Sequence, residues 1–289
     1  MAKGAKFSDC IADYNSIMKS IEARQFAPIY LLSGDEGYFI DAIADRLATT
    51  ILNEAERSFN QLTVYGQDSD PGKIVMLCRQ MPMMGSYQVV IVKEAQQLQK
   101  IENLNLYTSQ PQPTTILIVC YKNKEQGRGI DKRTAFYKSC VKSGCIFESI
   151  RPKEYEIDGW LSSHISSCGL NIDPKALAML KEHVGMDIAR MVKEIDKLKV
   201  SMGVDERVIT DSHIEQYIGL SKEYNTFELN DAVLKQDVGR AMRIAEHFAH
   251  NQKTYPITLT ITILFGLFQQ LFLLNYHMWQ SRKRSIPMP

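Results

Sequence analysis

The sequence has almost no excess of charge of either sign. Its 289 residues include 34 Lys and Arg and 33 Asp and Glu, which gives a formal net charge of +1. Proteins that hold nucleic acid unaided generally carry a basic excess, because neutralising phosphates supplies much of their affinity. The charge balance therefore argues against a stand-alone nucleic-acid-binding protein and predicts that any action on DNA depends on partner proteins.

The sequence also lacks clustered cysteines. None of the cysteine pairs has CxxC spacing, and the six are Cys10, Cys78, Cys120, Cys140, Cys145 and Cys168. A zinc site needs clustered thiolates or imidazoles, and a small secreted scaffold needs a denser framework. We therefore expect buried, reduced thiols, no metal site and a cytoplasmic protein, consistent with an N-terminus, MAKGAKFSDC, that has no secretory h-region.

An unbroken apolar run of membrane-spanning length is missing as well. The nearest candidate is residues 257–279, which contain three threonines and the pair Gln269–Gln270 near the middle. A buried helix in a helical domain is the favoured interpretation, and a membrane span is the open alternative.

From residue 28 the chain alternates between short apolar strands and helical patterns. Two of the strands, QVVIVK and TTILIVCY, are apolar at consecutive positions, which is typical of parallel strands covered on both faces. This pattern predicts an open parallel α/β domain over residues 1–150, with its ligand edge at the carboxyl ends of the strands. The expected strands are residues 29–33, 60–66, 88–93, 114–121 and 144–149.

After Pro152 the strand signals end and helical patterns take over. We expect a small helical domain over residues 151–220, including a helix that begins at Asp173-Pro174 and a capping box at Ser212 and Glu215. Residues 219–225 read as a linker, and a second helical module covers residues 221–289. The predicted fold class is thus α/β followed by all-α.

A phosphate-binding loop is absent where the first strand meets a helix. The motif G-x-x-x-x-G-K-[ST] uses glycines to wrap phosphates, a lysine to reach them and a hydroxyl to hold magnesium. Aligned on Gly34, the sequence has Phe39, Ile40 and Asp41 at the glycine, lysine and hydroxyl positions. The loop therefore lacks the groups that bind a nucleotide.

The acidic pair of an ATPase is missing after the strand at 88–93. Lys93-Glu94 stands there, with lysine at the position that would hold the metal. We expect no bound nucleotide, no other cofactor and no ATP hydrolysis. The pattern favours an ATPase-like fold with a degenerate site, and an α/β domain unrelated to ATPases stays open on this evidence alone.

Four segments, taken in order, resemble the delta subunit of the bacterial DNA polymerase III clamp loader. They are YLLSGDEGYFIDAIADRL (30–47), QMPMMGSYQVVIVKEAQ (80–96), ILIVCYKNK (116–124) and GMDIARMVKEIDKL (185–198). The resemblance spans nearly the whole chain. It implies an AAA+-like α/β domain, a helical lid over 151–220 and a helical collar over 221–289, whose C-terminal end is expected to be missing.

The resemblance also implies a function and a set of partners. A delta-like subunit binds the β sliding clamp and helps open one of its interfaces, so that primed DNA can enter. It sits in a five-membered ring with ATPase subunits of the tau/gamma type and a delta-prime subunit. It would be part of a DNA-directed DNA polymerase holoenzyme without ATPase chemistry of its own. The alternative function is a nucleotide-binding AAA+ switch or ATPase with an unusual site.

The family's clamp-binding element falls on a methionine-rich segment before the strand at 88–93. By resemblance, Met83 and Met84 enter a hydrophobic pocket of the clamp, Met81 supports them and Pro82 shapes the turn. Flexible thioethers at a helix end suit an adaptable protein pocket. The alternative is that these methionines only fill the core.

A basic cluster follows the strand at 114–121 and is a candidate contact for DNA or for a neighbouring subunit. A solvated loop is the more favoured interpretation, because acidic residues dilute the cluster. Its members are Lys122, Lys124, Arg128, Lys132 and Arg133.

Overall fold

The computed structural model divides the chain into two compact units, Met1–Glu156 and Ile157–Pro289. The expected lid and collar both lie in the second unit, and their separation into two modules stays a prediction. The structure describes residues 6–83, 85–123, 129–203, 206–218, 225–253 and 255–284.

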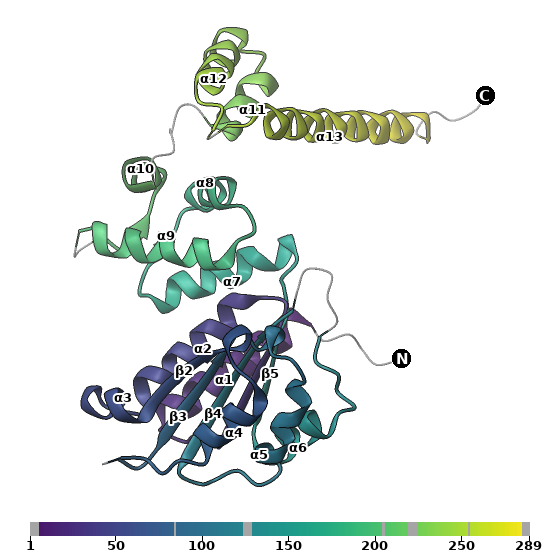
Figure 1. The fold of residues 1–289 in the computed structure, drawn as a ribbon. Helices are drawn as coiled ribbons and strands as arrows, with labels where there is room; N and C mark the ends of the chain where they lie inside the picture. Colours follow the sequence, from purple (N-terminus) through teal and green to yellow (C-terminus); the bar gives the residue numbers. More distant parts are fainter. Residues whose placement is uncertain are drawn as a thin grey trace. The chain divides into compact units, whose positions relative to one another are not determined.

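The first unit is built on a five-stranded sheet in the order β2-β3-β4-β1-β5, with every neighbouring pair parallel (Figure 1). On the central strand, Leu31 pairs with Val119 on one side and Ile146 on the other. The predicted parallel α/β sheet is confirmed. Its strands are β1 (Ile29–Gly34), β2 (Gln61–Tyr65), β3 (Gln88–Lys93), β4 (Thr115–Lys122) and β5 (Cys145–Ser149).

Helices cover both faces of this sheet, which explains why its strands are apolar at consecutive positions. Along β1, Ile29 and Leu31 join one buried cluster with Ile74 and Phe136. Residues between them point to the other face. The helices of the first face are α4 (Pro71–Cys78), α5 (Asn105–Thr108) and α6 (Ala135–Ser143), and those of the second are α1 (Phe7–Glu22) and α2 (Gly37–Thr50).

The core of the second face contains Phe39, which is fully buried. Its ring centroid lies 5.2 Å from that of Tyr14 and 6.0 Å from that of Phe7, both on α1. The sequence did not predict α1 as an element, although that helix supplies these two aromatic neighbours.

Local capping signals set the start of several helices. Asp70 caps α4, because its Oδ1 accepts from the Lys73 amide at 3.0 Å and Pro71 takes the first helical position. α3 (Glu54–Asn60) begins with a capping box, in which Asn53 and Glu56 each bond the other's backbone amide at 2.9 Å.

The second unit begins with helices packed around one apolar core. They are α7 (Glu154–Ser167), α8 (Pro174–Val184), α9 (Ile188–Ser201), α10 (Asp211–His213) and the π-turn η4 (Ile214–Ile218). Two short parallel strands, β6 (Asn171–Ile172) and β7 (Val208–Ile209), were not predicted.

One capping prediction in this unit is wrong. Thr210 and His213, rather than Ser212 and Glu215, form the capping box before α10. Asp173 precedes α8 as expected but makes no side-chain cap hydrogen bond.

Three helices complete the second unit: α11 (Thr226–Leu234), α12 (Val238–His250) and α13 (Ile257–Arg284). Leu229, Ile244 and Phe248 belong to the same buried cluster as the preceding helices. The expectation that residues 257–279 form a buried helix is wrong for α13. None of its most apolar window is buried, and among the described elements α11 packs most against it.

By length and composition alone, α13 is apolar enough to cross a membrane, with a mean hydropathy of 2.0 over Ile257–Trp279. Helices in the core of multi-subunit proteins meet the same test, so this is weak evidence for a span.

The buried thiols yield a prediction. Burial raises the pKa of Cys78, Cys120 and Cys140 to about 12. Since only the thiolate reacts, at pH 8 about one part in ten thousand of each thiol is reactive in the folded protein. We expect a thiol reagent at pH 8 to label these three only after unfolding, and to label the partly exposed Cys168 first. Rapid native labelling of the three, mapped by mass spectrometry, would contradict their burial.

A second prediction concerns Phe39. Removing this buried ring leaves a cavity beside Tyr14 and Phe7, so Phe39→Ala should lower the free energy of unfolding by about 3–5 kcal/mol in a urea titration. Met76, 71% exposed on α4, is the control, and Met76→Ala should stay within about 0.5 kcal/mol of the wild type. Equal effects for the two variants would place Phe39 outside the core.

Candidate functional site

The candidate functional residues lie at opposite edges of the sheet. Gly34, Lys93, Lys122 and Ser149 each end a strand, so they mark the carboxyl edge, where a nucleotide would bind in this class of fold. The methionine loop, which we define as residues 81–85, precedes β3 and therefore lies at the amino edge. The candidate clamp-binding residues and the candidate nucleotide site thus lie at opposite edges of the sheet.

At the carboxyl edge, the loop from β1 to α2 is folded against β5. Gly34 has a φ of 136°, and a Cβ added there would lie 2.0 Å from the Ser149 carbonyl oxygen. The Asp35 amide donates to that oxygen at 3.0 Å, and Ser149 Oγ donates to the Glu36 carbonyl at 2.6 Å. The Asp35 amide, a donor of the kind that a P-loop turns toward a phosphate, is thus engaged within the protein.

A lysine from β4 reaches this loop. Lys122 Nζ lies 2.7 Å from Asp41 Oδ2, and its Cδ and Cε lie 3.5 Å from the place of a Cβ on Gly37. The next residue, Asn123, donates from its amide to the Gly34 carbonyl and from Nδ2 to Asp35 Oδ1, both at 2.8 Å. This contact was not predicted from the sequence, although a lysine at the end of the strand beside β1 was the available signal.

The other departures from an ATPase site also have structural partners. Ile40, at the lysine position of a P-loop, is fully buried like Phe39. Lys93 Nζ lies 3.8 Å from Asp45 Oδ1 on α2, while Glu94 Oε2 accepts from Gln97 Nε2 at 2.7 Å. The degenerate residues thus form core or internal contacts.

At the amino edge, the methionine loop follows the end of α4 and projects apolar side chains. Met81 is 71% exposed and Met83 is 61% exposed, so the alternative that they fill the core is wrong for these two. Pro82 between them is half-buried, and Met84 lies outside the described residues. Exposed neighbouring apolar side chains of this kind are typical of a protein-binding surface.

Two buried amide side chains hold the segment around this loop. Gln88 Nε2 donates to the Leu77 carbonyl at 3.0 Å, which ties the end of α4 to β3. Asn60 Oδ1 accepts from the Met83 amide at 2.6 Å, and Asn60 Nδ2 donates to the Met83 carbonyl at 2.7 Å. Asn60 was not identified from the sequence, where nothing distinguishes it from an ordinary residue before a strand.

The candidate basic cluster is largely paired inside the first unit. Lys122 contacts Asp41, as described above. Lys132 Nζ lies 2.7 Å from Glu148 Oε2, and Arg133 Nη2 lies 2.9 Å from Asp131 Oδ2. Lys124 and Arg128 lie outside the described residues. A DNA or subunit contact by this cluster stays a prediction, and the three described members would meet such a partner with carboxylates beside them.

Within the part of the chain that the structure describes, no group of three or more His, Cys, Asp or Glu side chains is placed to hold a metal ion.

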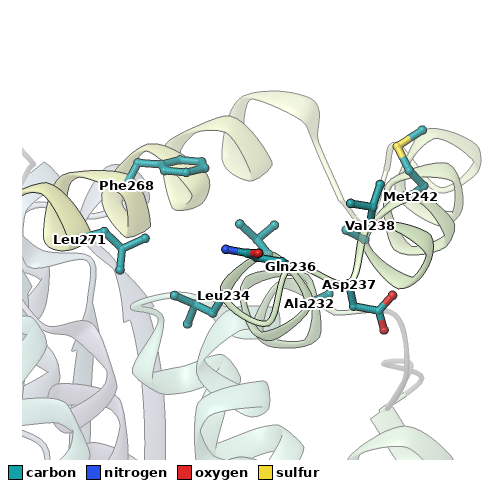
Figure 2. A pocket seen from close by; sticks show the side chains of 10 residues that line it. Ala232, Leu234, Gln236, Asp237, Val238, Met242, Phe268 and Leu271 are labelled. Carbon is teal, nitrogen blue, oxygen red and sulfur yellow. The ribbon is translucent and has the colours of Figure 1, made fainter.

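In the second unit, α11, α12 and α13 surround an open apolar pocket of about 600 Å³. Figure 2 shows Phe268 and Leu271 of α13 lining it across from Leu234 of α11. Met242 of α12 lines the same pocket and is 65% exposed. This surface adjoins exposed apolar side chains of α13, which include Phe265 and Phe272.

Polar contacts also tie α11 to α8. The Thr226 amide donates to Glu182 Oε1 at 3.0 Å, and burial raises the pKa of the Glu182 carboxyl. Lys175 Nζ lies 2.9 Å from Glu228 Oε1, and Glu228 also pairs with Arg240 of α12.

Comparison with known proteins gives three findings. Residues 30–148 match the family model described as DNA polymerase III, delta subunit. The chain is 24% identical over 266 residues to DNA polymerase III subunit delta of Bacillus subtilis strain 168, covering 88% of this chain and 75% of that protein. The solved DNA clamp loader delta protein of Bacillus subtilis matches 93% of this chain and 80% of its own, with a TM-score of 0.61 and 20% identity.

The structural match concerns the fold, and it agrees with a parallel α/β domain followed by helices. The family model covers most of the α/β unit, and the sequence relative extends over most of the chain. Together they confirm the resemblance found in the four sequence segments: the chain is similar to the delta subunits of bacterial DNA polymerase III.

Proposed function

We propose that this chain is the clamp-loader subunit that binds the β sliding clamp and helps open one clamp interface for loading onto primed DNA. The observation that carries the proposal is the methionine loop, which presents Met81 and Met83 to solvent at the end of a helix. The delta-subunit relatives support the same function.

The chemistry of the loop suits an apolar pocket on another protein. Each exposed methionine leaves apolar surface in water, and burying such surface contributes about 25 cal/mol per Å². A thioether side chain has three rotatable bonds and adapts to the shape of a pocket. A few such side chains at the centre of an interface generally supply most of its binding energy.

We infer that ATP hydrolysis in the complex belongs to partner subunits. In this chain the β1–α2 loop is bonded to β5, Lys122 pairs with Asp41, and Ile40 is buried where a P-loop needs its lysine. The alternative function, a nucleotide-binding switch or ATPase, would require all three arrangements to change.

Assembly is proposed to use the second unit. The exposed side of α13 and the adjoining pocket offer apolar surface to neighbouring ring subunits of the tau/gamma and delta-prime types. Burial in a collar accounts for the apolar surface of α13 without a membrane. The near-neutral charge suits a cytoplasmic subunit that meets primed DNA through the complex.

The clamp contact can be tested with Met83→Ala combined with Met84→Ala. We expect binding to a purified β clamp to weaken by more than about 2 kcal/mol, or roughly 30-fold in Kd, because two anchoring side chains are lost. Isothermal titration calorimetry measures the change.

Met186→Ala is the matched control for that experiment, because Met186 is also an exposed methionine but lies in the second unit. It should bind the clamp like the wild type. Unchanged affinity in the double variant would remove the clamp-binding assignment from this loop.

Nucleotide binding separates the two functions. Calorimetric titration of the purified chain with ATP and magnesium should give no measurable heat, since buried Ile40 replaces the phosphate-binding lysine and the Asp35 amide is bonded to Ser149. A micromolar, magnesium-dependent affinity would overturn the inference that the site is degenerate and favour the switch or ATPase.

A further inference from the structure

We propose that Asn60 is the positioning residue that sets the methionine loop for clamp binding. The proposal rests on the proposed function, because it assumes that the loop is the part that meets the clamp. Asn60 is not proposed to contact the clamp itself, because it is the last residue of α3 and is only 1% exposed.

The side chain of Asn60 holds both backbone groups of one loop residue. Its oxygen accepts from the Met83 amide at 2.6 Å, and its nitrogen donates to the Met83 carbonyl at 2.7 Å. The two bonds close a ring and fix the peptide groups on both sides of the Met83 Cα. With its amide and carbonyl turned toward α3, Met83 keeps its own side chain 61% exposed.

The far end of the loop packs closely on the same helix. A Cβ added to Gly85 would lie 2.9 Å from Asn60 Nδ2 and 3.2 Å from Glu56 Oε1. Glu56 is itself held by the capping box with Asn53 at the start of α3. The methionine loop therefore packs against a short helix whose first turn is held by its capping box. The last residue of this helix, Asn60, makes the two hydrogen bonds to Met83, which we call the clasp.

Sheet topology explains how a residue 23 positions away reaches the loop. β2 and β3 are parallel neighbours, and Gln61 pairs with Val89. Asn60 immediately precedes β2, so it lies beside the segment that leads into β3. Only a side-chain amide on a one-carbon stem supplies the donor and the acceptor at this reach, because aspartate loses the donor and glutamine is longer by one carbon.

The consequence for binding is pre-organisation. A loop that is ordered before it meets its partner does not lose that conformational freedom on binding, so its affinity is higher than that of the same side chains on a free loop. Removal of the clasp should therefore weaken binding even though every methionine is still present.

The test uses Asn60→Asp, Asn60→Ala and the control Ser149→Ala. Ser149 is also 1% exposed and bonds a backbone carbonyl, but it lies at the opposite edge of the sheet. Two quantities are measured on the full chain: hydrogen exchange of the Met83 amide in the free protein, and Kd for a purified β clamp. We expect both Asn60 variants to raise the exchange rate and Kd about tenfold, and Ser149→Ala to change neither.

A double-mutant cycle distinguishes positioning from a general loss of structure. If Asn60 acts through Met83, then Asn60→Ala should have little further effect on Kd in a Met83→Ala background, because the positioned side chain is already gone. Full additivity of the two changes would overturn the proposal, as would wild-type clamp affinity in both Asn60 variants.

Gly85→Ala disturbs the same clasp with Asn60 intact, and it is the variant to use if those at Asn60 do not fold. Its added methyl group meets Asn60 Nδ2, so it should also raise exchange at Met83 and weaken clamp binding; unchanged clamp affinity overturns the proposal. Failure of the proposed function looks different: Met83→Ala would leave clamp binding intact while the Asn60 variants still speed exchange at Met83.

Discussion

The structure of the first unit depends on burying both faces of a parallel sheet. A parallel strand must return to its starting edge through a crossover, so helices are laid on both faces and the strand ends gather at two opposite edges. One edge holds Gly34, Lys122 and Ser149, and the other holds Asn60 and the methionine loop. This constraint separates the surface proposed to meet the clamp from the place where an ATPase would bind its nucleotide.

Much of the first unit could be predicted from the sequence because its signals are local. The apolar run of β3 and the Asp70-Pro71 start of α4 each depend on residues close together in the chain. The contacts that define the sites are not local: Asn60 meets Met83 across 23 positions and Lys122 meets Asp41 across 81. Such pairs depend on strand order, which periodicity does not reveal.

The second unit shows a different limit. Its short strands β6 and β7 have two residues each, too few to produce an alternating pattern. The exposure of α13 could not be read from its composition either, since an apolar helix looks the same whether its own chain or another protein covers it. The contacts Thr226–Glu182 and Lys175–Glu228 do connect α11 to α8, so helices on both sides of the predicted linker share polar contacts as well as an apolar core.

The burial of Ile40 makes the loss of the nucleotide site hard to reverse. A lysine placed there would carry its ammonium group into a fully buried position, which costs several kcal/mol unless the group gives up its proton. Lys122 would meanwhile still occupy the loop opposite Asp41. Rebuilding a phosphate-binding loop here would therefore require the buried Ile40 side chain and the Lys122–Asp41 pair to be replaced together.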